Sequence, residues 1–151
     1  MLKTSNIQLG KYEKRYIKEM AEGFKLGVFG SRVLSGLKVD AIINEYIDKY
    51  SVKEIVTATN IGGVCGLARD IAHHRGIAQK LFAYDNKRFA GGCYHFRSIL
   101  IGANSDRILI IWDGKSRGTK GELEMCKKYG WKYDLFKIKE EEDYSLGRIF
   151  T

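Results

Sequence analysis

The sequence predicts an α/β fold, a single Rossmann-like domain in which a five-stranded, mainly parallel sheet carries helices on both faces. The first observation is that short apolar runs alternate with segments whose apolar residues recur at steps of three and four. The second is that the strand-like runs lead into polar loops containing glycine, as in parallel sheets that bind ligands. Right-handed crossovers between such strands predict an order of about 3-2-1-4-5.

The chain has 151 residues, enough for one domain with a substantial hydrophobic core. It has no run near the ~20 apolar residues of a membrane span, so no membrane partner is expected. Residues 1–10 lack the apolar core of a signal peptide, and three scattered cysteines indicate free thiols in a reducing, cytoplasmic compartment. The net charge of +8 reflects either a solvated, lysine-rich surface or an anionic partner such as a nucleotide, a nucleic acid or an acidic lipid.

Residues 1–23 are predicted to form an N-terminal helical extension. Within it, residues 11–22 carry apolar side chains at helical spacing, and Gly23 follows as a stop. The apolar stripe of this helix must cover either the sheet edge of its own chain or a partner chain, and the residues do not distinguish between the two.

The core domain is predicted to span residues 24–138. Its first half should contain a strand, a helix with one apolar face, a β-branched strand and a second helix, at 24–29, 39–50, 54–59 and 67–76. Its second half should contain a strand, a basic loop, a helix, a strand, a helix and a last strand, at 78–84, 85–93, 94–103, 108–112, 123–129 and 131–138. The helix at 94–103 is expected to face the core with Phe96, Ile99, Leu100 and Ala103. Residues 139–151 carry an acidic run and are expected to form an arm or a frayed end.

The most informative stretch is Asp113–Glu122, which follows an apolar strand and precedes a helical pattern. Its glycines let the backbone close on a ligand, and the first N–H groups of a helix point at such a ligand. Lysine and arginine add positive charge, and serine and threonine add hydroxyl groups. The stretch therefore predicts a cradle for a phosphate or a ribose phosphate.

In the predicted strand order, the first and fourth strands are neighbours at the topological switch point, where ligands bind beyond the carboxyl ends of the strands. Three loops should converge there, namely Gly30–Arg32, Asn60–Gly66 and Gly114–Thr119. The predicted ligand-binding residues are Gly30, Ser31, Arg32, Asn60, Gly62, Gly63, Asp113, Gly114, Lys115, Ser116, Arg117, Gly118 and Thr119. No cofactor is predicted. No metal site is predicted either, because the histidines and cysteines do not form two clusters at zinc-binding spacing.

Four motifs in register resemble the SLOG superfamily, and most closely its small stand-alone type related to YspA and YpsA. These motifs are Gly30–Arg32, Gly62–Ala68, Arg97 and Trp112–Thr119. The superfamily also holds the LOG phosphoribohydrolases, which activate cytokinins, and the Rossmann domain of the DNA-processing protein. The resemblance covers about residues 24–138 and implies a nucleotide-binding domain that forms homo-oligomers, at least dimers.

The resemblance also implies candidate catalytic residues. The phosphoribohydrolases read Pro-Gly-Gly-x-Gly-Thr-x-x-Glu after the fourth strand, where this chain keeps Gly118, Thr119 and Glu122 but replaces Pro-Gly-Gly with Gly114–Ser116. In those enzymes the glutamate and an arginine on the preceding helix are implied in cleaving the N-glycosidic bond of a nucleoside monophosphate. Glu122 and Arg97 are the matching positions here. A carboxylate suits this chemistry because it can stabilise an oxocarbenium-like sugar or activate water.

The same residues also have structural interpretations. Thr119 and Glu122 have the spacing of a helix capping box, and the glycines after the second strand could simply form a tight turn. Arg32 and Arg117 could contact phosphate or form surface salt bridges, and Arg97 could pair with a carboxylate of the cleft.

Three functions are consistent with the sequence. The leading hypothesis is a protein that binds a nucleotide or a nucleotide-derived phosphate ligand, as a sensor or to sequester it. The alternative is an N-glycosidic hydrolase acting on nucleoside monophosphates through Glu122 and Arg97. The third is a nucleic-acid binder, ranked last because the basic residues lack an accompanying run of aromatic side chains.

Overall fold

The computed structural model describes residues 23–83 and 93–143, which form one parallel sheet with helices on both faces. The strand order is β3-β2-β1-β4-β5, and all four strand pairings are parallel, which confirms the predicted fold class and order. The elements are β1 (Phe24–Gly30), α2 (Leu37–Tyr50), β2 (Val52–Ala58), α3 (Gly63–His74), β3 (Ala78–Phe82), α4 (Cys93–Ala103), β4 (Arg107–Trp112), α5 (Arg117–Tyr129), β5 (Tyr133–Lys137) and the 3₁₀ turn η1 (Glu140–Glu142).

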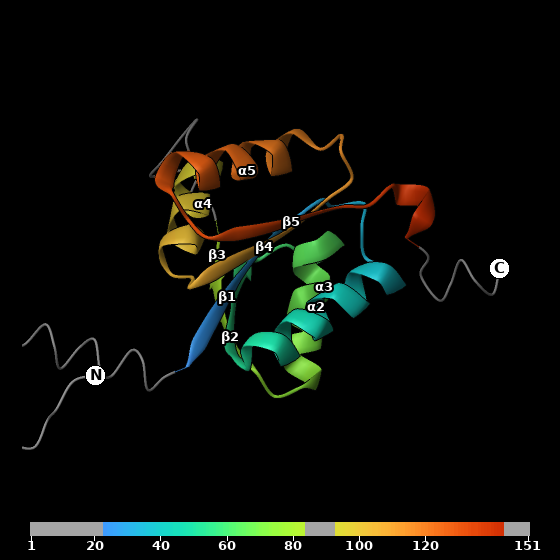
Figure 1. Cartoon of the computed structure of the whole chain (residues 1–151), viewed down its shortest axis with the longest axis vertical. Coiled ribbons are helices and arrows are strands. Elements are labelled where there is room, and N and C mark those ends of the chain that lie inside the picture. Colours follow the sequence, from blue (N-terminus) through green and yellow to red (C-terminus); the bar gives the residue numbers. More distant parts are fainter. Residues whose placement is uncertain (1–22, 84–92, 144–151) are drawn as a thin grey trace, which may run out of the picture.

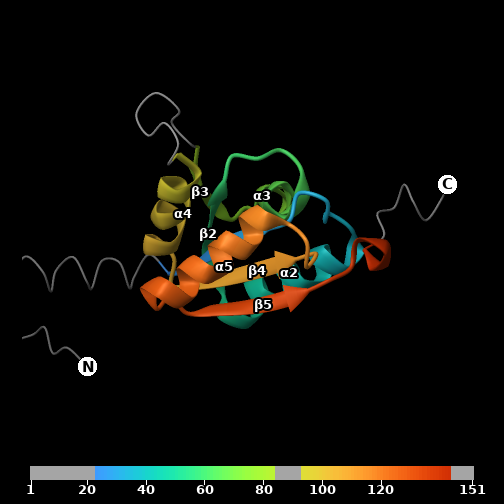
Figure 2. The same ribbon diagram turned by 90° about the horizontal axis from the view of Figure 1, so that it is seen from above.

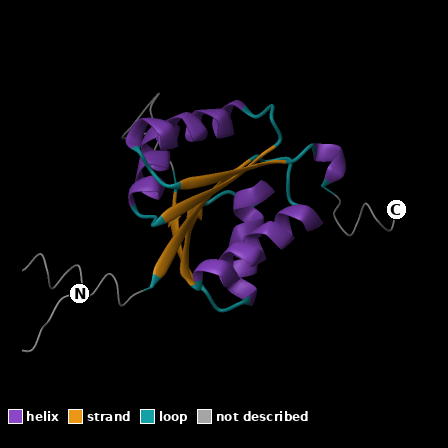
Figure 3. Ribbon diagram, viewed as in Figure 1, coloured by secondary structure: helices purple, strands orange, loops and turns teal. Residues whose placement is uncertain are grey.

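Helices α2 and α3 cover one face of the sheet and α4 and α5 cover the other (Figures 1 and 3). The central strands β1 and β4 supply both layers, because successive strand residues point to opposite faces. Leu26 and Leu109 pack in the layer under α2 and α3, whereas Phe29 and Ile110 pack in the layer under α4 and α5. Burial on both faces explains why the strand sequences read as continuous apolar runs rather than alternating ones.

Two helices begin earlier than the apolar periodicity predicts. Helix α3 begins at Gly63 rather than Leu67, and α5 begins at Arg117 rather than Leu123. Each of these first turns is poor in large apolar side chains, so periodicity cannot reveal it. As a result, Arg117, Gly118 and Thr119 belong to the first turn of a helix and not to the preceding loop.

The predicted inward face of α4 is wrong. Ala103 is exposed and Phe96 is 36% exposed, whereas Arg97 and Ile101 are 7% and 0% exposed. Ile99 and Leu100 are only partly buried. The inner face of α4 meets polar groups of α5, including the carboxyl group of Glu122, so a charged side chain lies inside where an apolar one was expected.

The start of the predicted C-terminal arm is packed against the body of the domain. Asp143 is fully buried, and its Oδ2 accepts a hydrogen bond from the backbone N–H of Gly36, the N-cap of α2, at 2.8 Å. Glu142 pairs with Lys38 at 3.2 Å. The helix predicted at residues 11–22, most of the loop predicted at 85–93 and the rest of the arm lie outside the described residues. Among the helices of the described parts, none is long and apolar enough to cross a bilayer.

Candidate functional site

A cavity of about 870 Å³ lies beyond the carboxyl ends of β1 and β4, the two strands at the switch point. In Figure 2 the arrowheads of β4 and β5 point to the same edge of the sheet. The cavity is lined by most of the predicted ligand-binding residues and by both predicted catalytic residues: Gly30, Ser31, Arg32, Asn60, Asp113, Lys115, Ser116, Arg117, Gly118, Thr119, Arg97 and Glu122. Three predicted residues, Gly62, Gly63 and Gly114, lie outside the lining.

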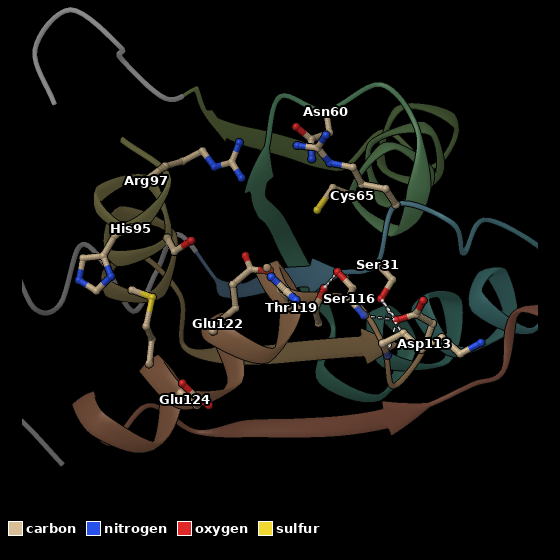
Figure 4. A pocket seen from close by; sticks show the side chains of 18 of the residues that line it. Ser31, Asn60, Cys65, His95, Arg97, Asp113, Ser116, Thr119, Glu122 and Glu124 are labelled. Atoms are coloured by element: carbon tan, nitrogen blue, oxygen red, sulfur yellow. Dashed lines mark hydrogen bonds between the residues drawn. The ribbon is translucent and has the colours of Figure 1, made fainter. Parts of the chain in front are cut away.

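Ser31 and Asp113 join the loops after β1 and β4 into one unit (Figure 4). The Ser31 hydroxyl donates a hydrogen bond to Asp113 Oδ1 at 3.0 Å and accepts one from the Asp113 backbone N–H at 3.0 Å. The Ser31 N–H donates to the Ile111 carbonyl at 3.0 Å, and the Ser31 carbonyl accepts from Val64 N–H at 3.2 Å. Because Ser31 is fully buried and its hydroxyl is engaged in this way, its principal role in the structure is to hold the two loops together.

The Asp113 carboxylate also binds its own loop. Oδ1 accepts hydrogen bonds from the backbone N–H groups of Lys115 at 3.0 Å and Ser116 at 2.8 Å. Burial by itself would raise the pKa of Asp113, but the N–H groups of Ser116 and Lys115 and the Ser31 hydroxyl outweigh it, so the pKa is lowered. The amides of Lys115 and Ser116 are therefore occupied by an internal anion.

The amides that remain for a ligand are those of the first turn of α5. Ser116 is the N-cap, its side chain makes no capping hydrogen bond, and the N–H of Lys120 is bonded to its carbonyl at 3.2 Å. The N–H groups of Arg117, Gly118 and Thr119 therefore have no acceptor within the helix. They carry the positive end of the helix dipole, which favours an anion.

The capping-box interpretation of Thr119 and Glu122 is wrong. Thr119 lies inside the helix, is 2% exposed, and donates from its hydroxyl to the Ser116 Oγ at 3.4 Å. Ser116 occupies the N-cap that the capping box assigns to Thr119. Local side-chain contacts hold this N-cap: the Ser116 carbonyl accepts a hydrogen bond from Trp112 Nε1 at 2.9 Å, and the Ser116 N–H donates to Asp113 Oδ1 at 2.8 Å.

Two of the glycines after β2, Gly63 and Gly66, have structural reasons to be glycine. Gly63 has φ +70°, and a side chain there would press on the backbone of Arg32. A Cβ on Gly66 would collide with the carbonyl of Ile61. Gly30, after β1, lies directly against the side chain of Val64. These contacts let α3 pack closely on the β1 loop. Gly63 serves this turn outside the cavity, whereas a Cβ on Gly62 would meet no atom within 4 Å.

Exposed basic side chains are available at the cavity. Arg32 and Arg117 are exposed, and neither forms an ion pair with another residue in the described ranges 23–83 and 93–143. The alternative that these two arginines form surface salt bridges therefore finds no support among the described residues. Lys115 is also exposed at the same rim.

Glu122 and Arg97 lie at the other side of the cavity, and their side chains extend toward its centre from α5 and α4 (Figure 4). Burial raises the pKa of Glu122 to about 8, although the charge of Arg97, a hydrogen bond with Ser98 and the charge of Arg32 act to lower it. A carboxyl group in this state is protonated in a large share of molecules at neutral pH. It can donate a proton or a hydrogen bond at the cavity wall, as well as accept one.

Sequence reasoning missed several lining residues. Those on α5 are Gly121, Glu124, Met125 and Lys128, and those elsewhere are Val33, Cys65, His95 and Ser98. Gly121, Met125 and Lys128 follow Gly118 at successive steps of three or four residues, so extending the helix to Arg117 places them on the cavity face. Burial raises the pKa of the Cys65 thiol, which donates to the Val28 carbonyl at 3.7 Å, so this thiol is poorly suited to act as a nucleophile.

No group of three or more histidine, cysteine, aspartate or glutamate side chains with metal-binding geometry occurs among the described residues. Comparisons with protein-family models, with curated protein sequences and with solved structures give no match to this chain. The structure thus establishes a Rossmann-like α/β fold with five parallel strands in the order 3-2-1-4-5.

Proposed function

We propose that this protein binds a nucleotide or a nucleotide-derived phosphate ligand in the cavity at the switch point, as a sensor or a sequestering protein. The observation that carries the proposal is the uncapped N-terminus of α5, which opens into a cavity of about 870 Å³. Its three amides have no helical acceptor, and the N-cap side chain supplies none. A phosphate oxygen is a ligand suited to such a helix end.

The surrounding charges support an anionic ligand. Arg32, Lys115 and Arg117 line the cavity and are exposed to it. The Asp113 carboxylate is engaged internally, because it accepts hydrogen bonds from two amides of its own loop and from the Ser31 hydroxyl. The resemblance of the four motifs to the SLOG superfamily supports the same assignment, and we propose membership of that superfamily on this basis.

The binding proposal can be tested by isothermal titration and thermal shift with inorganic phosphate, nucleoside monophosphates, cyclic dinucleotides and ADP-ribose. Binding of a ligand to the folded state alone should raise the melting temperature. Arg32→Ala and Arg117→Ala should each weaken binding of the best ligand by about tenfold or more, because each removes a charge-assisted contact.

Lys127→Ala is the matched control, since Lys127 is an exposed cation on the same helix and outside the lining. If no phosphate compound binds, or if Lys127→Ala weakens binding as much as Arg117→Ala does, the proposal fails. Binding only to single-stranded nucleic acid, with a steep loss of affinity on adding salt, would favour the third function instead.

A second candidate function is N-glycosidic hydrolysis of a nucleoside monophosphate. The observation that favours it is the carboxyl group of Glu122, held beside Arg97 and Ser98 with a pKa raised to about 8. Such a group could protonate a departing base or stabilise a positively charged sugar. The test is to incubate the protein with nucleoside monophosphates and to detect the release of free base by chromatography. Glu122→Gln should abolish the release while the ligand still binds, and absence of release by the unaltered protein would leave binding as the function.

A further inference from the structure

Helix α5 carries two glycines on its cavity face, Gly118 and Gly121, that neither backbone conformation nor packing requires. Neither is among the glycines with positive φ, and a Cβ at either position would meet no atom of another element within 4 Å. Gly30 and Gly63, by contrast, are each pressed against a neighbouring element. Glycine is among the poorest helix formers, so two of them in one short helix need another explanation.

Their positions along α5 follow the cavity away from the helix end. Gly118 is the second residue of the helix and one of the three with a free amide. Gly121 lies three residues further on, about 4.5 Å along the axis at the usual helical rise. Met125 also lines the cavity, about 10 Å along the axis from Gly118.

A ligand whose phosphate rests on the helix end can follow the cavity face of α5, which brings its next group over Gly121. At a glycine the helix backbone is bare, so that a flat ring can approach it more closely than it could approach a side chain. Glu122 follows directly in the sequence and extends its carboxyl group into the same cavity, where it can hydrogen-bond to polar groups of that ring (Figure 4).

We propose that Gly121 is a specificity-determining residue, which admits a phosphate ester whose first ring lies against the surface of α5. This inference rests on the proposed function, because it assumes that the phosphate occupies the helix end. It adds that the ligand runs along α5. It also adds that the absence of a side chain at residue 121 determines the size of the group that can be attached to the phosphate.

The experiment compares Gly121→Ala and Gly121→Leu with the unaltered protein by isothermal titration. The probes are inorganic phosphate and the four common ribonucleoside 5′-monophosphates. Phosphate affinity should stay within about twofold in both variants, because the helix end is untouched. Affinity for the tightest monophosphate should fall by about tenfold in the alanine variant and further in the leucine variant. The melting temperature of the ligand-free alanine variant should be unchanged or higher, since alanine is the better helix former.

Lys127→Ala, on the same helix and outside the lining, controls for changes in helix propensity and should bind both probes as the unaltered protein does. Equal affinity of the Gly121 variants and the unaltered protein for the monophosphate would overturn the inference and leave the proposed function standing. Binding of phosphate without any monophosphate would overturn it as well. If the unaltered protein binds none of these probes, the inference fails, whereas the proposed function fails only if cyclic dinucleotides and ADP-ribose do not bind either.

Discussion

The partly buried carboxyl group of Glu122 predicts an unusual dependence of stability on pH. Its pKa is raised from 4.5 to about 8, chiefly by burial, against the lowering influence of Arg97, Ser98 and Arg32. Between these two pKa values, the folded protein holds the proton and the unfolded chain has released it. The contribution of Glu122 to stability is therefore complete below about pH 4.5 and is lost as the pH rises toward 8.

The magnitude follows from the linkage relation. When the folded state binds one proton more than the unfolded chain, the free energy of unfolding falls by about 1.4 kcal/mol for each unit by which the pH rises. Between about pH 5 and pH 7 the loss is about 2–3 kcal/mol. For a chain of this size, a loss of that order lowers the melting temperature by roughly 5–10 °C.

The assay is urea unfolding followed by circular dichroism at about pH 5, 6 and 7, on the unaltered protein and on Glu122→Gln. Glutamine keeps the size of the side chain but cannot ionise. The stability of the Glu122→Gln variant relative to the unaltered protein should therefore rise with pH. Contributions of other titrating groups are common to both proteins and cancel in the difference. Glu124→Gln is the control, because Glu124 is an exposed carboxylate on the same helix. Parallel pH profiles for Glu122→Gln and the unaltered protein would refute the reasoning.

Three further predictions concern stability and assembly. Asp113→Ala removes the acceptor for the Ser31 hydroxyl and two loop amides, and should lower the free energy of unfolding by roughly 2–4 kcal/mol. Urea unfolding would measure this change. A change near zero would show that the loops hold together without the carboxylate. Asp143→Ala removes the acceptor for the Gly36 N–H at the start of α2 and should cost about 1–2 kcal/mol by the same method, whereas an unchanged value would mean that the packed arm adds nothing. If the predicted helix at 11–22 forms the contact of a homo-oligomer, deleting residues 1–22 should yield a monomer by light scattering, and an unchanged mass would place the contact elsewhere.

The fold could be predicted because its signals are local or general. Apolar runs such as Ile108–Trp112 identify buried strands, and helical spacing identifies the helices between them. The right-handedness of crossovers then orders the strands without any knowledge of particular contacts. The same rule brings the loops after β1 and β4 together, so most of the cavity lining was predictable from the sequence.

The tertiary structure alone decided how individual side chains at the site are used. Ser31 and Asp113 are 82 residues apart in the chain, so only the folded structure shows that the Ser31 hydroxyl binds the carboxylate. The same oxygen accepts from the amides of Lys115 and Ser116, while the end of α5 stays open. The sequence left open whether Arg97 acts on a ligand or pairs with a carboxylate of the cleft, and only the structure shows that it is buried beside the carboxyl group of Glu122. Periodicity reports which residues avoid water on average. It does not report which polar groups find partners across the fold, because those partners come from elements that are distant in the sequence.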